Sequence, residues 1–150
     1  MHNDFPAHRT VLYVEDNEIN AMLMQALFER RPDLRLIVAP DCASALDRAR
    51  TQRFDLLLLD LRLPDGHGCT LLPQLRALPG LQRVPAIAVS AEDMPAMNLH
   101  GFDDQWQKPL CMVKVLDRLD HWLPERLGRG HQSLPVAGWA PAPRSGMAVR

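Results

Sequence analysis

Apolar residues follow two alternating patterns along the first 127 positions. Short runs of apolar and β-branched residues, typical of strands, alternate with segments in which apolar residues recur every three or four positions, typical of helices. The runs predict strands at residues 10–14, 34–39, 54–60, 85–90 and about 104–107. The helical spacing predicts helices within residues 19–28, 43–49, 71–78, 94–99 and 113–123, of which the fourth is weak.

The third predicted strand, residues 54–60, is the most informative for the fold class. Its four consecutive leucines lie between two aspartates, a pattern expected of a strand that is buried on both faces. Five strand–helix units in succession predict a parallel sheet with helices on both sides. We therefore expect an α/β fold, a flavodoxin-like doubly wound (βα)5 sheet with the strand order 2-1-3-4-5.

Two segments interrupt the alternation. Residues 61–68 (LRLPDGHG) contain a proline and two glycines, which predicts a loop. After Leu127 the periodic pattern ends, and Gly, Pro, Ala and Arg dominate residues 128–150. We expect a single domain over residues 9–127, followed by a flexible tail or linker over residues 128–150.

Composition narrows the function classes. The chain of 150 residues has a net charge of −1, and its last 23 residues carry three arginines and no acid, so the predicted domain region is mildly acidic. This charge argues against direct binding of nucleic acid. The apolar runs are far shorter than the roughly 20 residues that span a bilayer, and residues 1–10 do not resemble a signal peptide. Three unpaired cysteines fit reduced thiols, and we expect a cytoplasmic protein.

Chemically active side chains follow the predicted strands. Glu15 and Asp16 end the first strand, Asp60 the third, Ser90 the fourth and Lys108 the fifth. Ligands of such sheets bind outside the carboxyl ends of the strands, where the strand order reverses. Converging carboxylates repel one another. A bound Mg²⁺, which prefers oxygen ligands of this kind, would relieve the repulsion. We expect a Mg²⁺ site that positions a phosphoryl group, with Asp60 as the nucleophile.

Four segments at strand ends carry a family resemblance. VLYVEDNEIN, FDLLLLDLRLPDGHG, PAIAVSA and FDDQWQKPL, in this order, resemble the receiver domain of two-component response regulators over about residues 9–127. The EDNEIN and DLRLPDGHG segments are most similar to receivers of hybrid histidine kinases and phosphorelays. The resemblance implies a sensor histidine kinase or histidine phosphotransfer domain as the phosphoryl donor, with a protein as the downstream partner.

The resemblance also assigns roles in the cleft. It makes Asp60 the phosphoacceptor and Glu15 and Asp16 the acidic pair that holds Mg²⁺, with Asp16 as the direct ligand. The backbone carbonyl of Arg62 is a further implied ligand of the metal. No separate substrate is implied, since a receiver catalyses only its own phosphorylation and dephosphorylation.

Residues of the last two strands are assigned to the phosphoryl group and to switching. Ser90 is expected to bond the phosphoryl group, Lys108 to pair with it, and the bond before Pro109 to be cis. Gln105 stands at the switch position, where family members place Tyr or Phe. Lys108 lies only 18 positions after Ser90. This spacing is shorter than usual by about one helical turn, so we expect a shortened fourth helix and altered output.

Two alternatives remain open from the sequence. The first is a receiver-fold interaction module with an impaired phosphorylation switch, suggested by Gln105 and the short fourth helix. The second is an aspartate-nucleophile phosphatase of the haloacid dehalogenase type. Such enzymes place a second acid two residues after the nucleophile, where this chain has Arg62, and this alternative therefore ranks last.

Overall fold

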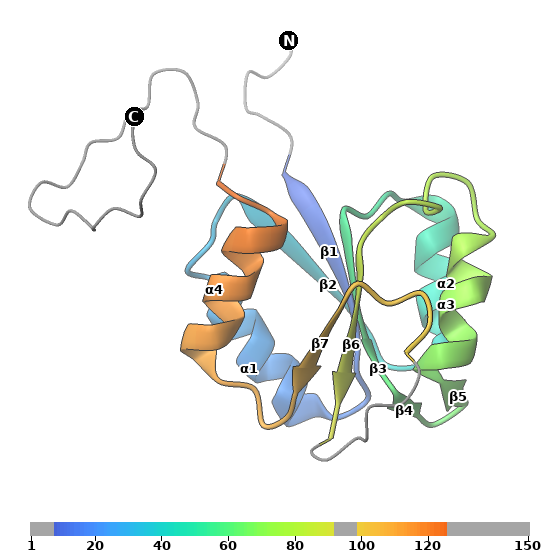
Figure 1. Ribbon diagram of the computed structural model, residues 1–150, viewed down its shortest axis with the longest axis horizontal. Coiled ribbons are helices and arrows are strands. Elements are labelled where there is room, and N and C mark those ends of the chain that lie inside the picture. The colour runs from blue at the N-terminus through green and yellow to red at the C-terminus, as the bar shows by residue number, and fades with distance from the viewer. Residues whose placement is uncertain (1–7, 92–98, 126–150) are drawn as a thin grey trace, which may run out of the picture.

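A five-stranded parallel sheet forms the centre of the molecule (Figure 1). The computed structural model describes residues 8–91 and 99–125. The strands lie in the order β2-β1-β3-β6-β7, and each neighbouring pair is parallel. Their bounds are β1 (Arg9–Val14), β2 (Leu34–Ala39), β3 (Leu56–Asp60), β6 (Ala86–Ser90) and β7 (Asp104–Gln107). Without the two short strands β4 and β5, this is the predicted order 2-1-3-4-5.

Helices cover both faces of the sheet, which confirms the doubly wound α/β prediction. Helices α1 (Glu18–Phe28) and α4 (Met112–Trp122) lie on one face. Helices α2 (Cys42–Thr51) and α3 (Gly68–Arg76) lie on the other (Figure 1). No helix in residues 8–91 and 99–125 is long and apolar enough to cross a membrane.

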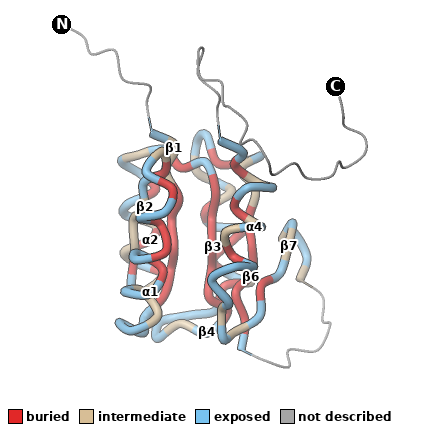
Figure 2. Tube along the Cα trace, turned by 90° about the vertical axis from the view of Figure 1, so that its left-hand side faces the viewer, coloured by how far each residue is buried: buried red, intermediate tan, exposed pale blue. Residues whose placement is uncertain are grey.

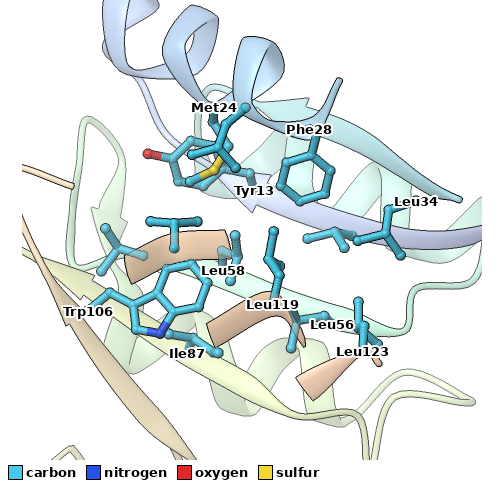
Figure 3. Packing of buried hydrophobic residues seen from close by; sticks show 14 residues of the cluster. Tyr13, Met24, Phe28, Leu34, Leu56, Leu58, Ile87, Trp106, Leu119 and Leu123 are labelled. Carbon is cyan, nitrogen blue, oxygen red and sulfur yellow. The ribbon is translucent and has the colours of Figure 1, made fainter. Parts of the chain in front are cut away.

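Alternation along the strands divides the core into two layers. Val11, Tyr13, Leu56 and Leu58 pack with residues of α1 and α4 in one cluster (Figure 3), whereas their sequence neighbours point to α2 and α3 in the other. All five residues of β3 are buried (Figure 2), as the four leucines predict. Burial of both faces explains why this strand lacks the apolar–polar alternation of a half-exposed strand.

Two clusters of charged residues fix α4 against the sheet. Asp104 of β7 accepts hydrogen bonds from Arg118 and Trp122 of α4, with donor–acceptor distances of 2.8 and 3.0 Å. Arg31, which is buried, donates to Asp120 and to the carbonyl of Leu123 at 2.8 and 2.7 Å. The last helix is therefore held at its middle and at its carboxyl end.

The segment after β3 differs from the predicted loop. Strands β4 (Arg62–Leu63) and β5 (Gly66–His67) form a short antiparallel hairpin around Pro64 and Asp65. Helix α3 then begins at Gly68, earlier than predicted, because His67 Nδ1 accepts a hydrogen bond from the Cys69 amide and caps its first turn. Pro73 consequently lies inside the helix.

Two predictions fall largely or wholly on other parts of the chain. Most of the weak fourth helix, predicted to be shortened, falls at residues 92–98, and the tail at 128–150; both segments lie outside the described residues. The cysteines Cys42, Cys69 and Cys111 are free thiols, as the sequence predicts.

Candidate functional site

Three carboxylates meet at the carboxyl ends of β1 and β3. These strands are neighbours with Val14 beside Leu59, so the residues that follow them, Glu15 and Asp60, are brought together. One oxygen from each of Glu15, Asp16 and Asp60 lies within 4.8 Å of the others. Glu15 and Asp60 are only 2% and 6% exposed, whereas Asp16 is exposed. The sheet thus builds an acidic cluster at the point where its strand order reverses.

Glu15 is held as a carboxylate by three donors. Its oxygens accept from the Tyr13 hydroxyl at 2.9 Å, from the Asn17 amide at 3.0 Å and from Lys108 Nζ at 3.0 Å. Burial alone would raise the pKa of Glu15, but these hydrogen bonds outweigh it and hold the pKa below its usual value. Both oxygens of Glu15 are therefore already engaged.

Tyr13 is a member of the site that was not predicted from the sequence. Burial, together with the neighbouring Glu15 carboxylate, raises the pKa of Tyr13, so its hydroxyl stays protonated and donates. Within an apolar strand a tyrosine is expected to be core, and its ring does pack in the core (Figure 3). One signal was available: Tyr13, the chain's only tyrosine, lies two residues before Glu15, and therefore on the same side of the strand.

Lys108 bridges the two buried carboxylates. Its Nζ lies 3.0 Å from Glu15 Oε1 and 3.0 Å from Asp60 Oδ2. The residue follows β7, its amide donates to the Ser90 carbonyl at 2.7 Å, and the Lys108–Pro109 bond is cis. Burial would lower the pKa of Lys108, but the two carboxylates outweigh it and raise the pKa. The ammonium group is therefore a fixed positive charge of the cleft.

The buried carboxylate of Asp60 is only partly compensated by its partners. Its oxygens accept from the Arg62 amide at 3.2 Å and from Lys108 at 3.0 Å. Burial and the neighbouring Glu15 carboxylate nevertheless raise the pKa of Asp60, against the effect of Lys108 and Arg62. One ammonium group does not fully compensate two buried carboxylates, and a further cation would stabilise the cluster.

The donor set fits Mg²⁺. This ion is commonly bound through one or two carboxylates together with water and phosphate oxygens. Asp16 makes no hydrogen bond or ion pair within the described part of the chain, and Asp60 lies beside it. These two residues are the better direct ligands, because the oxygens of Glu15 are occupied.

Ser90 and Gln105 form a polar pair beside the carboxylates. Ser90 ends β6, is 1% exposed, and follows Val89, which pairs with Asp60 in the sheet. Gln105 Nε2 donates to Ser90 Oγ at 3.1 Å. Gln105, at the position expected to switch, therefore donates to the hydroxyl expected to bind the phosphoryl group. The neighbouring Trp106 is buried and packs in the core (Figure 3).

Comparison with known proteins places the chain in a family. The family model "Response regulator receiver domain" matches residues 11–119. The polar-differentiation response regulator DivK of Brucella anthropi is 30% identical over 119 residues, which is 77% of this chain and 96% of that protein. The sensor histidine kinase AruS of Pseudomonas aeruginosa is 42% identical over 111 residues, which is 70% of this chain but 11% of the kinase.

One solved structure is similar to this chain in both fold and sequence. The receiver domain of sensor histidine kinase PA1611 from Pseudomonas aeruginosa, with a magnesium ion coordinated in its active site cleft, has a TM-score of 0.70 and 30% identity. The match covers 79% of this chain and all of that one. Receivers are signalling modules rather than enzymes with a separate substrate, so the phosphatase alternative is set aside. The chain belongs to the response regulator receiver domain family of two-component signalling proteins.

Proposed function

We propose that this chain accepts a phosphoryl group on Asp60 from a phosphohistidine donor and signals through protein contacts. The observation that supports this most is the convergence of Glu15, Asp16 and Asp60 at one end of the sheet, with Lys108 Nζ 3.0 Å from two of them. A buried aspartate beside a cation site and a fixed ammonium group suits phosphoryl transfer, which depends on positioning and charge neutralisation.

In the proposed step, an oxygen of Asp60 attacks the phosphorus of the donor. A P–O bond forms, the P–N bond breaks, and its electron pair remains on the donor's imidazole. Mg²⁺, held by Asp16, Asp60 and the Arg62 carbonyl, with Glu15 beside it, would neutralise charge on the phosphoryl oxygens and the carboxylates. Water later hydrolyses the acyl phosphate and releases inorganic phosphate.

The remaining cleft residues would bind the transferred group. Lys108 would exchange its bond to Asp60 Oδ2 for a phosphoryl oxygen, which leaves its contact with Glu15 in place. The Ser90 hydroxyl would donate a hydrogen bond to another phosphoryl oxygen while still accepting one from Gln105 Nε2. Phosphorylation would then change the hydrogen bond between Ser90 of β6 and Gln105 of β7, and so affect both strands.

The donor is proposed to be a histidine kinase or phosphotransfer domain, the partners with which receivers act. Ile19, Met22 and Leu23 of α1 are each 63–64% exposed and lie just after the acidic pair, so an apolar protein surface could dock beside the cleft. Similarity to hybrid kinases such as AruS supports this class of partner. We further infer a receiver unit over residues 9–127 with a linker over 128–150, acting in the cytoplasm.

Intact mass after incubation with acetyl phosphate and Mg²⁺ tests the proposal. A single phosphoryl adduct is expected, and it should be absent from Asp60→Asn and from metal-free samples. An adduct that survives Asp60→Asn would contradict the assignment of the phosphoacceptor.

An interaction module without a working switch is the second candidate, because Gln105 replaces the expected aromatic residue. It predicts equal affinity for a partner whether or not Asp60 carries a phosphoryl group. If folded protein accepts phosphate neither from acetyl phosphate nor from a phosphohistidine donor, this candidate replaces the first.

A further inference from the structure

The carboxylate of Asp65 joins the β4–β5 hairpin, which follows β3, to helix α2. Asp65 lies in the turn between β4 and β5. Its Oδ1 accepts from the Cys42 amide at 2.8 Å, and its Oδ2 accepts from the Ala43 amide at 3.1 Å. These amides belong to the first two residues of α2. Both carboxylate oxygens are therefore committed to another element of the fold.

Helix α2 already has its own cap. Asp41 accepts from the Ser44 amide at 2.8 Å and forms a capping box with that residue. The first four amides of a helix have no partner within the helix, and Asp65 bonds two that Asp41 does not reach. Close packing accompanies the bonds, since a Cβ added to Gly66 would lie 3.0 Å from Cys42 Sγ. Asp65 thus docks the hairpin tip on α2.

The base of the same hairpin lies at the phosphoacceptor. The Arg62 amide donates to Asp60 Oδ1 at 3.2 Å, and Arg62 pairs with His67 across the hairpin. The Gly68 amide donates to the Leu61 carbonyl at 3.0 Å. The exposed hairpin is therefore fixed at β3 by its base, where Arg62 lies, and at α2 by its tip.

We propose that Asp65 is a positioning residue of the site, which acts through the backbone of Arg62. By fixing the hairpin tip, Asp65 maintains the hydrogen bond from the Arg62 amide to Asp60. It also keeps the Arg62 carbonyl in place as a ligand that a cation would bind. This inference rests on the proposed function. It adds a residue that touches neither metal nor phosphoryl group but sets the affinity of the site for Mg²⁺.

The matched pair Asp65→Ala and Asp41→Ala separates positioning from helix capping. Both variants remove a carboxylate from the first turn of α2, but only Asp65→Ala releases the hairpin. Calorimetric titration with MgCl₂ should show affinity about tenfold weaker for Asp65→Ala, the lower end of the range for outer-shell partners of metal sites. Asp41→Ala should stay within about twofold of the parent protein, even though it loses a cap.

Amide hydrogen exchange gives a readout that does not depend on the metal. The Arg62 amide should lose protection in Asp65→Ala and keep it in Asp41→Ala. If Asp65→Ala does not fold, Asp65→Asn, which keeps one acceptor oxygen, should show the same two effects in smaller measure. Equal Mg²⁺ affinity and equal Arg62 protection in parent and Asp65 variants would overturn the proposal while the proposed function stands. A parent protein that binds no Mg²⁺ would instead overturn the metal site itself.

Discussion

Lys108 offsets part of the negative charge of the cleft, because its Nζ contacts both buried carboxylates. Lys108→Ala should lower the free energy of unfolding by about 1–3 kcal/mol, since hydrogen bonds to charged groups are lost and the carboxylates remain buried. Urea titration measures the loss, and MgCl₂ should recover part of it by supplying another cation.

The other lysine of the chain provides the control. Lys114 lies on α4, is exposed, and makes no ion pair among the residues that the structure describes. Lys114→Ala should change the free energy of unfolding by less than about 0.5 kcal/mol. Equal losses in the two variants would show that Lys108 does not pair with Glu15 and Asp60 in solution.

The sequence predicts the cleft well where a residue's place follows from a strand end. Glu15 and Asp60 adjoin because β1 and β3 are neighbours, and that adjacency follows from the predicted strand order. Tyr13 and Asp65 were not predicted as functional, since their roles depend on particular contacts with Glu15 and with the first turn of α2. Hydrophobic periodicity carries no information about such hydrogen bonds.

At the scale of elements, the long strands were predictable and the short ones were not. Apolar runs of four or more residues specify β1 and β3, whereas the two-residue strands β4 and β5 have no period to detect. The start of α3 was misplaced for a physical reason. It depends on the cap from His67 and on Gly68, where a Cβ would lie 2.7 Å from the Asp60 carbonyl oxygen, and only a structure reveals either contact.

The attachment of α4 to β7 should depend on pH through Asp104. Burial would raise the pKa of this residue, but hydrogen bonds from Trp122 and Arg118 outweigh it and lower the pKa. A lowered pKa in the folded state adds stability above the unfolded value of about 3.9, and that stability disappears as pH falls through the folded value. Asp104→Asn should therefore cost about 1–3 kcal/mol at pH 7.

The difference between parent and Asp104→Asn should shrink steadily below about pH 4. Chemical unfolding at several pH values measures it. As a control, Asp117→Asn, an exposed change on α4, should alter the free energy of unfolding at pH 7 by less than about 0.5 kcal/mol. A pH-independent gap between parent and Asp104→Asn would contradict a bonded carboxylate at this position.

Helix α1 is apolar on two sides, one in the core and one in solvent. Met24, Leu27 and Phe28 are buried, whereas Met22 and Leu23 are exposed. Replacing Met22 and Leu23 by serine should leave the free energy of unfolding within about 1 kcal/mol of the parent value, because neither side chain is buried. Labelling by acetyl phosphate should also be unchanged.

Labelling by a phosphorylated histidine phosphotransfer domain should slow about tenfold in the Met22→Ser, Leu23→Ser variant, because a protein donor must cover the rim of the cleft. That factor corresponds to about 1.4 kcal/mol of lost contact. Quenched-flow phosphotransfer measures the rate. Equal slowing with acetyl phosphate would mean that the variant disturbs the cleft itself.

At the scale of the whole molecule, α4 completes the core cluster that the sheet shares with α1. Leu119 of α4 and Leu123, which follows the helix, are buried, and Arg31 donates to the Leu123 carbonyl. A chain ending at Leu127 should unfold with a free energy within about 0.5 kcal/mol of the full chain. A chain ending at Arg118 should fail to fold, because it loses two core leucines at about 2–5 kcal/mol each. Circular dichroism during thermal unfolding distinguishes these outcomes.

The first and last parts of the described fold meet on the side away from the cleft. Arg9, at the start of β1, donates to the carbonyl of Pro124, whereas Glu15 follows the other end of that strand, about 20 Å away. Neighbouring domains joined at either terminus, or at both, would therefore not crowd Asp60. The same unit could serve equally as a diffusible protein or as one module inside a larger kinase, since its points of attachment and its acidic cluster lie at opposite ends of the sheet.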